Sequence, residues 1–273
     1  MIKHLERTLF VAFMIVNSLS AQMVGNLADG LVAYYPLHSD IKDYSSNGND
    51  LISSTGNSSF VSGSLSIGDN EYLYSKNKIG ISGNQSRTVS LWFKPSSTPS
   101  SADGGYLASW GVGNKFWGDS TLMYSSAWSG DGSPAFAYVA SGSWDGVSVP
   151  SVDNNWTNIT YVYDGNPYTS SFYINGVLNN TLIGWADPVA SPLLPDTVDT
   201  QVFFNARTFS TGSGEPIVDE GVGIGINGNY KDIAIYNRAL SGSEVAQLVP
   251  EPSALSLFAV GLGALALVRR RRS

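Results

Sequence analysis

The sequence has no cysteine and only two histidines, His4 and His38, among its 273 residues. The missing thiols exclude disulfide bridges, cysteine nucleophiles and Cys-ligated zinc or iron–sulfur centres. The scarcity of imidazole argues against histidine-rich metal sites and against a Ser–His catalytic arrangement. The chain therefore offers no thiol and very few imidazole groups for chemistry.

Charged residues are also few, at 14% of the chain against roughly 25% in an ordinary soluble domain. The balance is acidic, with a formal net charge of −7, and this excludes the basic footprint of a nucleic-acid-binding protein. The chain is instead rich in glycine, with 29 residues, and 12% of it is aromatic. That composition is too aromatic for a disordered chain and favours strands joined by tight turns.

Residues 1–21 have the pattern of a cleavable export signal. Lys3 and Arg7 form a basic region, an apolar run follows at residues 8–16, and small residues precede a cleavage site expected after Ser20 or Ala21. An uncleaved anchor helix is the alternative. The apolar run is too short to cross a bilayer core about 30 Å thick, so export is the prediction.

The other end, residues 250–273, has three parts. They are Pro250-Glu251-Pro252, an apolar run at 254–268, and an arginine cluster that begins with Arg269 and Arg270. This tail resembles the PEP-CTERM sorting signal of Gram-negative bacteria, and an ordinary tail anchor is the alternative. In that family an exosortase recognises the tail and processes it near the PEP residues.

The resemblance implies where the protein resides. The body would lie on the outer surface or in the extracellular matrix of a Gram-negative bacterium. Before processing, the apolar helix would anchor the chain transiently in the inner membrane. The arginines would hold that end at the cytoplasmic face by the positive-inside rule.

Between the two ends lies one domain, residues 22–249. Short apolar runs are separated by Gly, Asn, Asp and Ser turns, and Val89, Leu91 and Phe93 alternate with other residues as in a strand. Hairpins are expected at Asn175-Gly176 and across Asp69-Asn70. The pattern predicts an all-β, two-sheet antiparallel jelly-roll sandwich. One short helix is expected after a capping box at residues 241–244.

Four stretches in order resemble the laminin-G-like, concanavalin A-like jelly roll of secreted bacterial proteins. They are residues 31–37 (LVAYYPL), 43–50 (DYSSNGND), 156–165 (WTNITYVYDG) and 231–240 (KDIAIYNRAL). The resemblance implies that the first and last strands lie side by side. It also assigns Trp92 and Trp156 to the packed core, because their strands match the family framework.

A structural calcium ion is the first candidate ligand. Asp43, Asn47 and Asp50 offer oxygen donors close together in one loop, and oxygen is what calcium prefers. Similar jelly rolls hold calcium near the first and last strands, which adds Asp232 of the closing strand. The alternative is that these side chains only organise turns.

Carbohydrate is the second candidate ligand. Trp117, Trp128 and Trp144 lie among Gly, Ser and Asp residues, as loop tryptophans do. Exposed indole rings with polar groups beside them are typical of sugar-binding surfaces. The alternative is that each ring packs inside the protein.

Catalysis is not expected. Similar jelly rolls include glucanases of the laminarinase type, which carry two glutamates on one strand in an E-x-D-x-x-E pattern. Here Glu215 and Glu220 are separated by an odd interval, which places them on opposite faces of a strand. The sequence therefore predicts a non-enzymatic adhesion or matrix protein that binds glycan or protein, for example a polysaccharide or exopolysaccharide matrix. The alternatives are a structural envelope protein without a ligand, and a glycoside hydrolase or lyase.

Overall fold

The computed structural model describes most of the body of the chain. The described residues are 25–68, 70–99, 105–111, 120–126, 132–140, 143–165, 169–179, 182–184, 197–209, 217–218 and 225–249. The predicted export signal at residues 1–21 and the tail at residues 250–273, with its apolar run at 254–268, lie outside them. Among the described helices, none has the length and apolar character needed to cross a bilayer.

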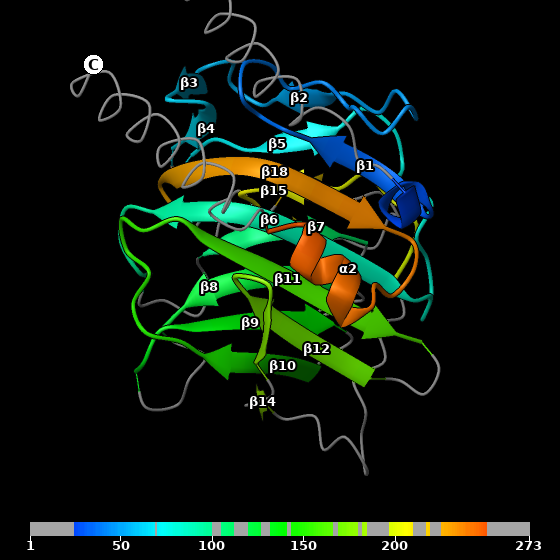
Figure 1. Ribbon diagram of the computed structural model, residues 1–273. Coiled ribbons are helices and arrows are strands. Elements are labelled where there is room, and N and C mark those ends of the chain that lie inside the picture. The colour runs from blue at the N-terminus through cyan, green and yellow to red at the C-terminus, as the bar shows by residue number, and fades with distance from the viewer. Residues whose placement is uncertain are drawn as a thin grey trace, which may run out of the picture.

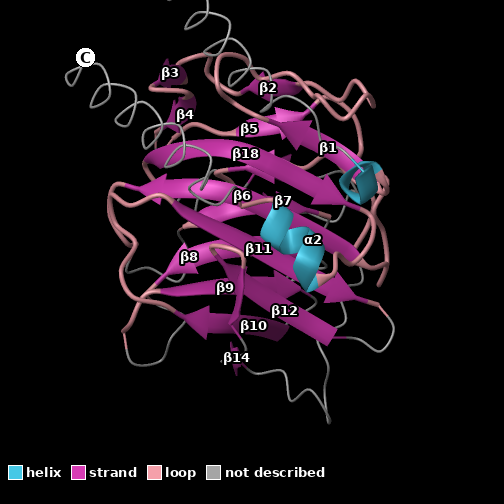
Figure 2. Cartoon of the chain, in the orientation of Figure 1, coloured by secondary structure: helices cyan, strands magenta, loops and turns pink. Residues whose placement is uncertain are grey.

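The domain consists of two eight-stranded antiparallel sheets, here called sheet A and sheet B (Figures 1 and 2). In order across sheet A lie β13 (Val177–Asn179), β12 (Thr169–Ile174), β11 (Thr157–Asp164), β6 (Arg87–Pro95), β18 (Gly228–Tyr236), β4 (Ser64–Ile67) and β3 (Ser59–Val61), and β1 (Leu31–Tyr35) also pairs with β18. In order across sheet B lie β14 (Leu182–Gly184), β10 (Ser143–Ser148), β9 (Ala135–Ala140), β8 (Ser120–Ser125), β7 (Tyr106–Trp110), β15 (Phe203–Phe204), β5 (Leu73–Ser75) and β2 (Leu51–Ser53). The remaining elements are a small sheet of β16 (Thr208–Phe209) and β17 (Ile217–Val218), the 3-10 helix η1 (Gly25–Ala28) and the helix α2 (Gly242–Gln247). The predicted jelly-roll sandwich is confirmed.

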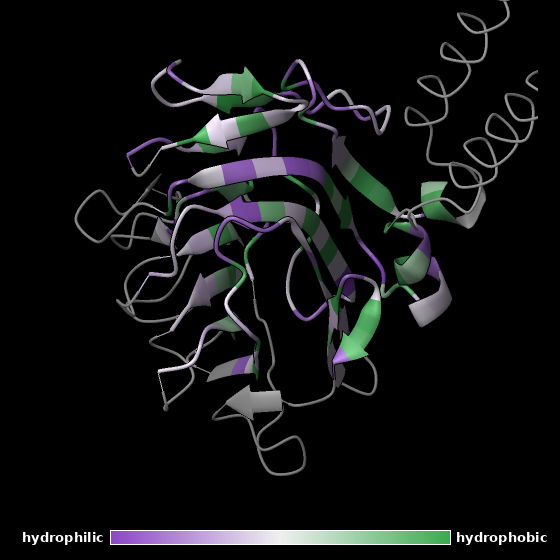
Figure 3. Cartoon of the chain, turned by 60° about the vertical axis from the view of Figure 1, so that its left-hand side comes forward, coloured by the Kyte–Doolittle hydropathy of each residue, from purple (hydrophilic) through white to green (hydrophobic). Residues whose placement is uncertain are grey.

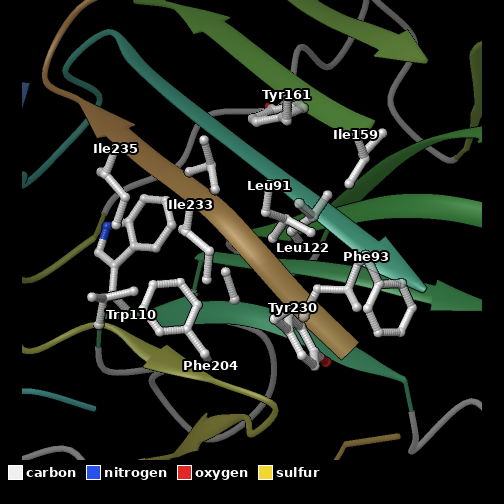
Figure 4. Packing of buried hydrophobic residues seen from close by; sticks show 14 of the residues in the cluster. Leu91, Phe93, Trp110, Leu122, Ile159, Tyr161, Phe204, Tyr230, Ile233 and Ile235 are labelled. Atoms are coloured by element: carbon white, nitrogen blue, oxygen red, sulfur yellow. The ribbon is translucent and has the colours of Figure 1, made fainter. Parts of the chain in front are cut away.

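The main core fills the space between the two sheets. Leu91 and Phe93 of β6 and Ile159 of β11 are fully buried there and meet Trp110 and Leu122 of sheet B (Figure 4). Hydropathy changes from residue to residue along the strands, because one face packs inward while the other faces out (Figure 3). This period of two decides which side chains reach the outer face of sheet A.

The two predicted hairpins have different outcomes. At Asn175-Gly176, Ile174 pairs with Val177, and both turn residues have positive φ (51° and 77°), so this hairpin is confirmed. The hairpin across Asp69-Asn70 is wrong. β4 pairs with β3 and β18 in sheet A, whereas β5 pairs with β2 and β15 in sheet B. The turn therefore carries the chain from one sheet to the other, a long-range choice that a local turn signal does not encode.

The closing strand β18 changes partner along its length. Its first residues pair with β4, and its last residues pair with β1, which confirms that the first and last strands lie side by side. A β-bulge between Lys231 and Ala234 marks the change, and Asp232 within it has a φ of 49°. The Asp232 N–H then donates to the carbonyl of Pro36, just beyond β1.

Helix α2 covers one end of the outer face of sheet A (Figures 1 and 2). Val245 of the helix is fully buried against Val162, Tyr173 and Tyr236 of three strands. The predicted capping box is present, because the Ser241 side chain accepts from the Glu244 N–H and the Glu244 carboxylate accepts from the Ser241 N–H. We call the end under α2 the covered half; its sheet residues are Thr88, Val162, Ala234 and Tyr236.

Candidate functional site

The three tryptophans predicted to bind sugar are placed only in part. Trp117 and Trp128 lie outside the described residues. The backbone of Trp144 lies in β10, where it pairs with Val139 of β9, and its side chain is outside the described part of the structure. A sugar site at these three residues therefore stays a prediction.

Two other tryptophans lie on the surface instead. Trp92 and Trp156 are half-buried, so their assignment to the packed core is wrong. Leu91 and Phe93 are fully buried, and the alternation of β6 therefore turns Trp92, between them, to the outer face of sheet A. The sequence contained this signal, because the period that places Leu91 and Phe93 inside must place Trp92 outside.

A lysine ammonium lies between the two indole rings. Lys231 of β18 is the direct cross-strand partner of Trp92. Its Nζ is 5.4 Å from the centre of the Trp92 ring and 4.7 Å from that of Trp156, the geometry of cation–π contacts. Lys94 is two residues beyond Trp92 on the same face of β6 and is also half-buried. We call Trp92, Lys94, Trp156 and Lys231 the open half of the outer face.

A buried polar network lies next to Trp92 in the adjoining strand. Asn158 of β11 is the other cross-strand partner of Trp92 and is fully buried. Its amide donates to the Ser90 hydroxyl and the Leu91 carbonyl, at 3.2 and 3.3 Å, and its oxygen accepts from Thr160 at 3.0 Å. Satisfied networks of this kind hold side chains in one arrangement, so the open half rests on a rigid base.

The first predicted calcium ligand, Asp43, has its carboxylate fully engaged. One oxygen accepts from the N–H groups of Tyr34 and Ser45, at 3.0 and 2.8 Å. The other accepts from the Ser45 hydroxyl and the Asn49 N–H, at 2.9 and 3.0 Å. A carboxylate offers about four lone-pair sites, and these four donors occupy that number.

The other predicted ligands have hydrogen-bond partners of their own. The Asn47 amide donates to the carbonyls of Leu31 and Val32, and Asp50 accepts from the Asp43 N–H. Asp232 is held by other partners, described below. Among the described residues no group of three or more acidic or histidine side chains could hold a metal ion. The hydrogen bonds of Asp43, Asn47 and Asp50 organise the turns of the loop, and a calcium site at the four residues stays a prediction.

Asp232 pairs with the histidine of the described region. Its Oδ1 lies 3.2 Å from His38 Nε2 and accepts from the Tyr34 hydroxyl, also at 3.2 Å. The hydrogen bond to Asp232 raises the pKa of His38, and the nearby Lys231 ammonium opposes that rise. Both side chains are partly exposed, at 41% for His38 and 28% for Asp232. The pair lies next to the open half, and the Asp232 carboxylate contacts Tyr34 of β1.

An open pocket of about 380 Å³ lies elsewhere, beside the start of β1. Its lining consists of the polar residues Asn47, Asn49, Asn77, Lys78 and Asn237, together with residues 30–32 and 79–80. The lining contains no aromatic ring, so the pocket lacks the apolar platform that sugar rings stack on.

Comparison with known proteins identifies the family. The family profile described as the concanavalin A-like lectin/glucanases superfamily (Laminin_G_3) matches residues 67–246, more than half of the chain. The chain belongs to this superfamily. The profile of the PEP-CTERM protein-sorting motif matches residues 248–272, which indicates export to the cell envelope and implies processing by an exosortase. A search of the curated proteins finds no match.

Several solved structures share the fold at low sequence identity. Domain 4 of AbnA, a GH43 extracellular arabinanase from Geobacillus stearothermophilus solved with arabinotriose, has a TM-score of 0.57 and 17% identity over 81% of this chain and 98% of that chain. The binding domain of botulinum neurotoxin serotype D has a TM-score of 0.53 and 14% identity over 82% of this chain and 51% of that chain. A botulinum neurotoxin type C structure, whose cell entry depends on two ganglioside molecules, has a TM-score of 0.51 and 16% identity, again over about half of that chain.

The superfamily includes glucanases, so the carboxylates of the body bear on catalysis. Glu71 is buried and accepts from the hydroxyls of Ser53 and Thr55. Glu244 caps α2 and binds Arg238 through two hydrogen bonds, at 2.7 and 3.1 Å. Each thus has a structural role, and Glu215 and Glu220 lie outside the described residues. The fold is shared by binding domains and by enzymes, and no catalysis is shown for this chain.

Proposed function

We propose that this exported envelope protein binds glycan through the open half of sheet A and thereby serves adhesion or matrix association. The observation that carries the proposal is the pair of half-buried indole rings, Trp92 and Trp156, held on a rigid sheet with Lys231 between them. Indole rings offer a flat apolar platform for sugar rings, and polar groups beside them fix orientation. Solved neighbours with arabinotriose or ganglioside ligands support the choice of ligand class.

Binding is tested with the purified full-length chain against a broad polysaccharide panel, by the change in tryptophan fluorescence and by calorimetry. Trp92→Ala and Trp156→Ala are each expected to weaken binding about 5- to 150-fold, because an aromatic platform contributes about 1–3 kcal/mol. Tyr44→Ala is the matched control, since Tyr44 is an aromatic residue 51% exposed outside the open half. A folded protein that binds no member of the panel overturns the proposal and leaves a structural envelope protein.

The same experiment separates this surface from the loop tryptophans. A triple variant of Trp117→Ala, Trp128→Ala and Trp144→Ala is expected to retain binding. If instead the triple variant loses binding while Trp92→Ala keeps it, the ligand site lies at those three residues. Titration in EDTA is expected to leave binding unchanged, because the carboxylate of Asp43 is already fully hydrogen-bonded.

For sorting, we propose that an exosortase of a Gram-negative bacterium processes the tail near Pro250-Glu251-Pro252, after residues 254–268 have anchored the chain transiently in the inner membrane. The sorting-motif match over residues 248–272 supports this. Glu251→Ala is expected to accumulate an unprocessed, membrane-associated chain, measured by cell fractionation. Replacement of Arg269 and Arg270 by serine tests the cytoplasmic retention of that end. Normal processing of Glu251→Ala would contradict the proposed site.

A further inference from the structure

We propose that the open half selects acidic glycans, with the carboxylate of a uronic acid bound at Lys231 and its sugar ring lying on an indole. This inference rests on the proposed function, which it narrows from glycans in general to carboxylated ones. It is based on the hydrogen-bond donors of the open half, which are the Lys231 ammonium and the indole N–H groups.

The charged atom in contact with both rings is a hydrogen-bond donor. Lys231 Nζ contacts the rings of Trp92 and Trp156, and within the described part of the chain it has no carboxylate at salt-bridge distance. Neither indole N–H has a hydrogen-bond acceptor among the described residues, although both side chains are half-buried. A surface of unmatched donors is complementary to a ligand that is rich in acceptors, and a carboxylate is the strongest acceptor a sugar carries.

The ammonium of Lys231 is also electrostatically unbalanced. The two ring contacts hold it and partly replace its hydration, but an aromatic face carries no net charge. Its neighbour in sequence, Asp232, is engaged with His38 and the Tyr34 hydroxyl. A ligand anion would therefore supply a counter-charge that the described residues do not place at Lys231.

A second cation reinforces the same preference. Lys94 stands on the same face of β6 as Trp92, and its cross-strand partner on β18 is the neutral Asn229. Lys94 and Lys231 therefore lie on adjacent strands at neighbouring register positions. The whole chain is acidic, at −7, and six of its 15 basic residues lie in the two ends, so two lysines beside two indoles are a local exception. The acidic residues elsewhere on the protein would repel a polyanion that has no sugar ring to stack on the indoles. An acidic sugar is therefore favoured over an anion without a ring.

The test compares acidic polymers with their own neutral esters. Polygalacturonate, alginate and hyaluronan are each titrated into the full-length chain beside the carboxyl-methylated form of the same polymer, with polyglutamate as an anion that has no sugar ring. At least one acid form is expected to bind at least about tenfold more tightly than its ester, with a marked loss at high salt. Polyglutamate is expected not to bind.

Two variants assign the preference to the lysine. Lys231→Met keeps the apolar stem and is expected to reduce affinity for the acid form about tenfold, to that for the ester, and to remove the salt dependence. Lys76→Met is the matched control, because Lys76 is an exposed lysine beyond β5 of sheet B. Circular dichroism checks that each variant is folded.

The outcomes distinguish the two proposals. Equal binding of acid and ester forms, or an unchanged preference in Lys231→Met, overturns the selection of acidic glycans while glycan binding stands. Binding of polyglutamate as tight as that of the acid polymers also overturns it, because charge alone would then suffice. If neither these polymers nor the neutral panel bind at all, the proposed function itself fails.

Discussion

On the outer face of sheet A, three neighbouring strands carry two different surfaces. In the covered half, Tyr236 of β18, Thr88 of β6 and Val162 of β11 lie in one cross-strand row and are buried under α2. In the open half, Lys231, Trp92 and Asn158 form the equivalent row, and no described helix covers the half-buried Trp92 and Lys231.

The two halves differ because helix α2 is too short to cover both of them. Helix α2 has six residues, and at 1.5 Å per residue it is about 9 Å long, too short to cover the whole outer face of sheet A. The chain reaches α2 directly from the end of β18, so the helix folds back over that end of the sheet. Large aromatic residues under α2 are buried and stabilise the fold, whereas Trp92 and Trp156 at the other end stay partly exposed.

The largest effect is expected under the helix. Tyr236→Ala removes a ring that is 0% exposed and leaves a cavity between β18 and α2. The free energy of unfolding should fall by about 3 kcal/mol, measured by urea denaturation. Tyr44→Ala, at a 51% exposed ring, should change it by less than about 0.5 kcal/mol. A loss below about 1 kcal/mol for Tyr236→Ala would contradict the distinction between the halves.

The buried polar network beside Trp92 should respond next. Asn158→Ala leaves the Leu91 carbonyl and the Ser90 and Thr160 hydroxyls without their amide partner. Because buried polar groups left unsatisfied are costly, we expect a loss of about 2 kcal/mol in the free energy of unfolding, together with weaker glycan binding. Unchanged binding in this variant would show that the network does not position Trp92.

The cap of α2 should make stability depend on pH. The Arg238 guanidinium, with further hydrogen bonds from Ser241, lowers the pKa of Glu244 to about 2, from an ordinary value of 4.5. A lowered carboxylate pKa stabilises the fold above pH 4.5, and that contribution is lost as the pH falls toward 2.

Glu244→Gln should therefore lower the free energy of unfolding by about 1–2 kcal/mol at pH 7, with allowance for solvent screening. The difference from the native chain should shrink as the pH approaches 2, which denaturation at a series of pH values measures. A difference that stays constant from pH 7 to 3 would mean that the effect comes from packing rather than charge.

The smallest effect on stability is expected in the open half. Trp92→Ala should lower the free energy of unfolding by less than about 1 kcal/mol, because the ring is half-buried and no described helix packs on it. The same variant should lose glycan binding. A loss as large as that of Tyr236→Ala would show that Trp92 belongs to the packed structure after all.

The fold followed from local patterns in the sequence. Alternation in β6, the Asn175-Gly176 turn and the capping box of α2 each depend on residues close in sequence, so each was predicted correctly. The order of the motifs was enough to place the first strand beside the last. The partners of β4 and β5 were not predictable, since the choice between two sheets depends on contacts made far along the chain.

The site depended more on tertiary structure. The sequence alone determined that Trp92 faces away from Leu91 and Phe93, because the period of a strand is two. Only the pairing of β6 with β11 and β18 decided that Lys231 stands beside Trp92 and within reach of Trp156, which are far apart in the chain. Tertiary structure also decided the partners of Asp43. Its carboxylate accepts from the N–H groups of Tyr34 and Asn49, because a loop carboxylate binds whichever donors the surrounding backbone brings near.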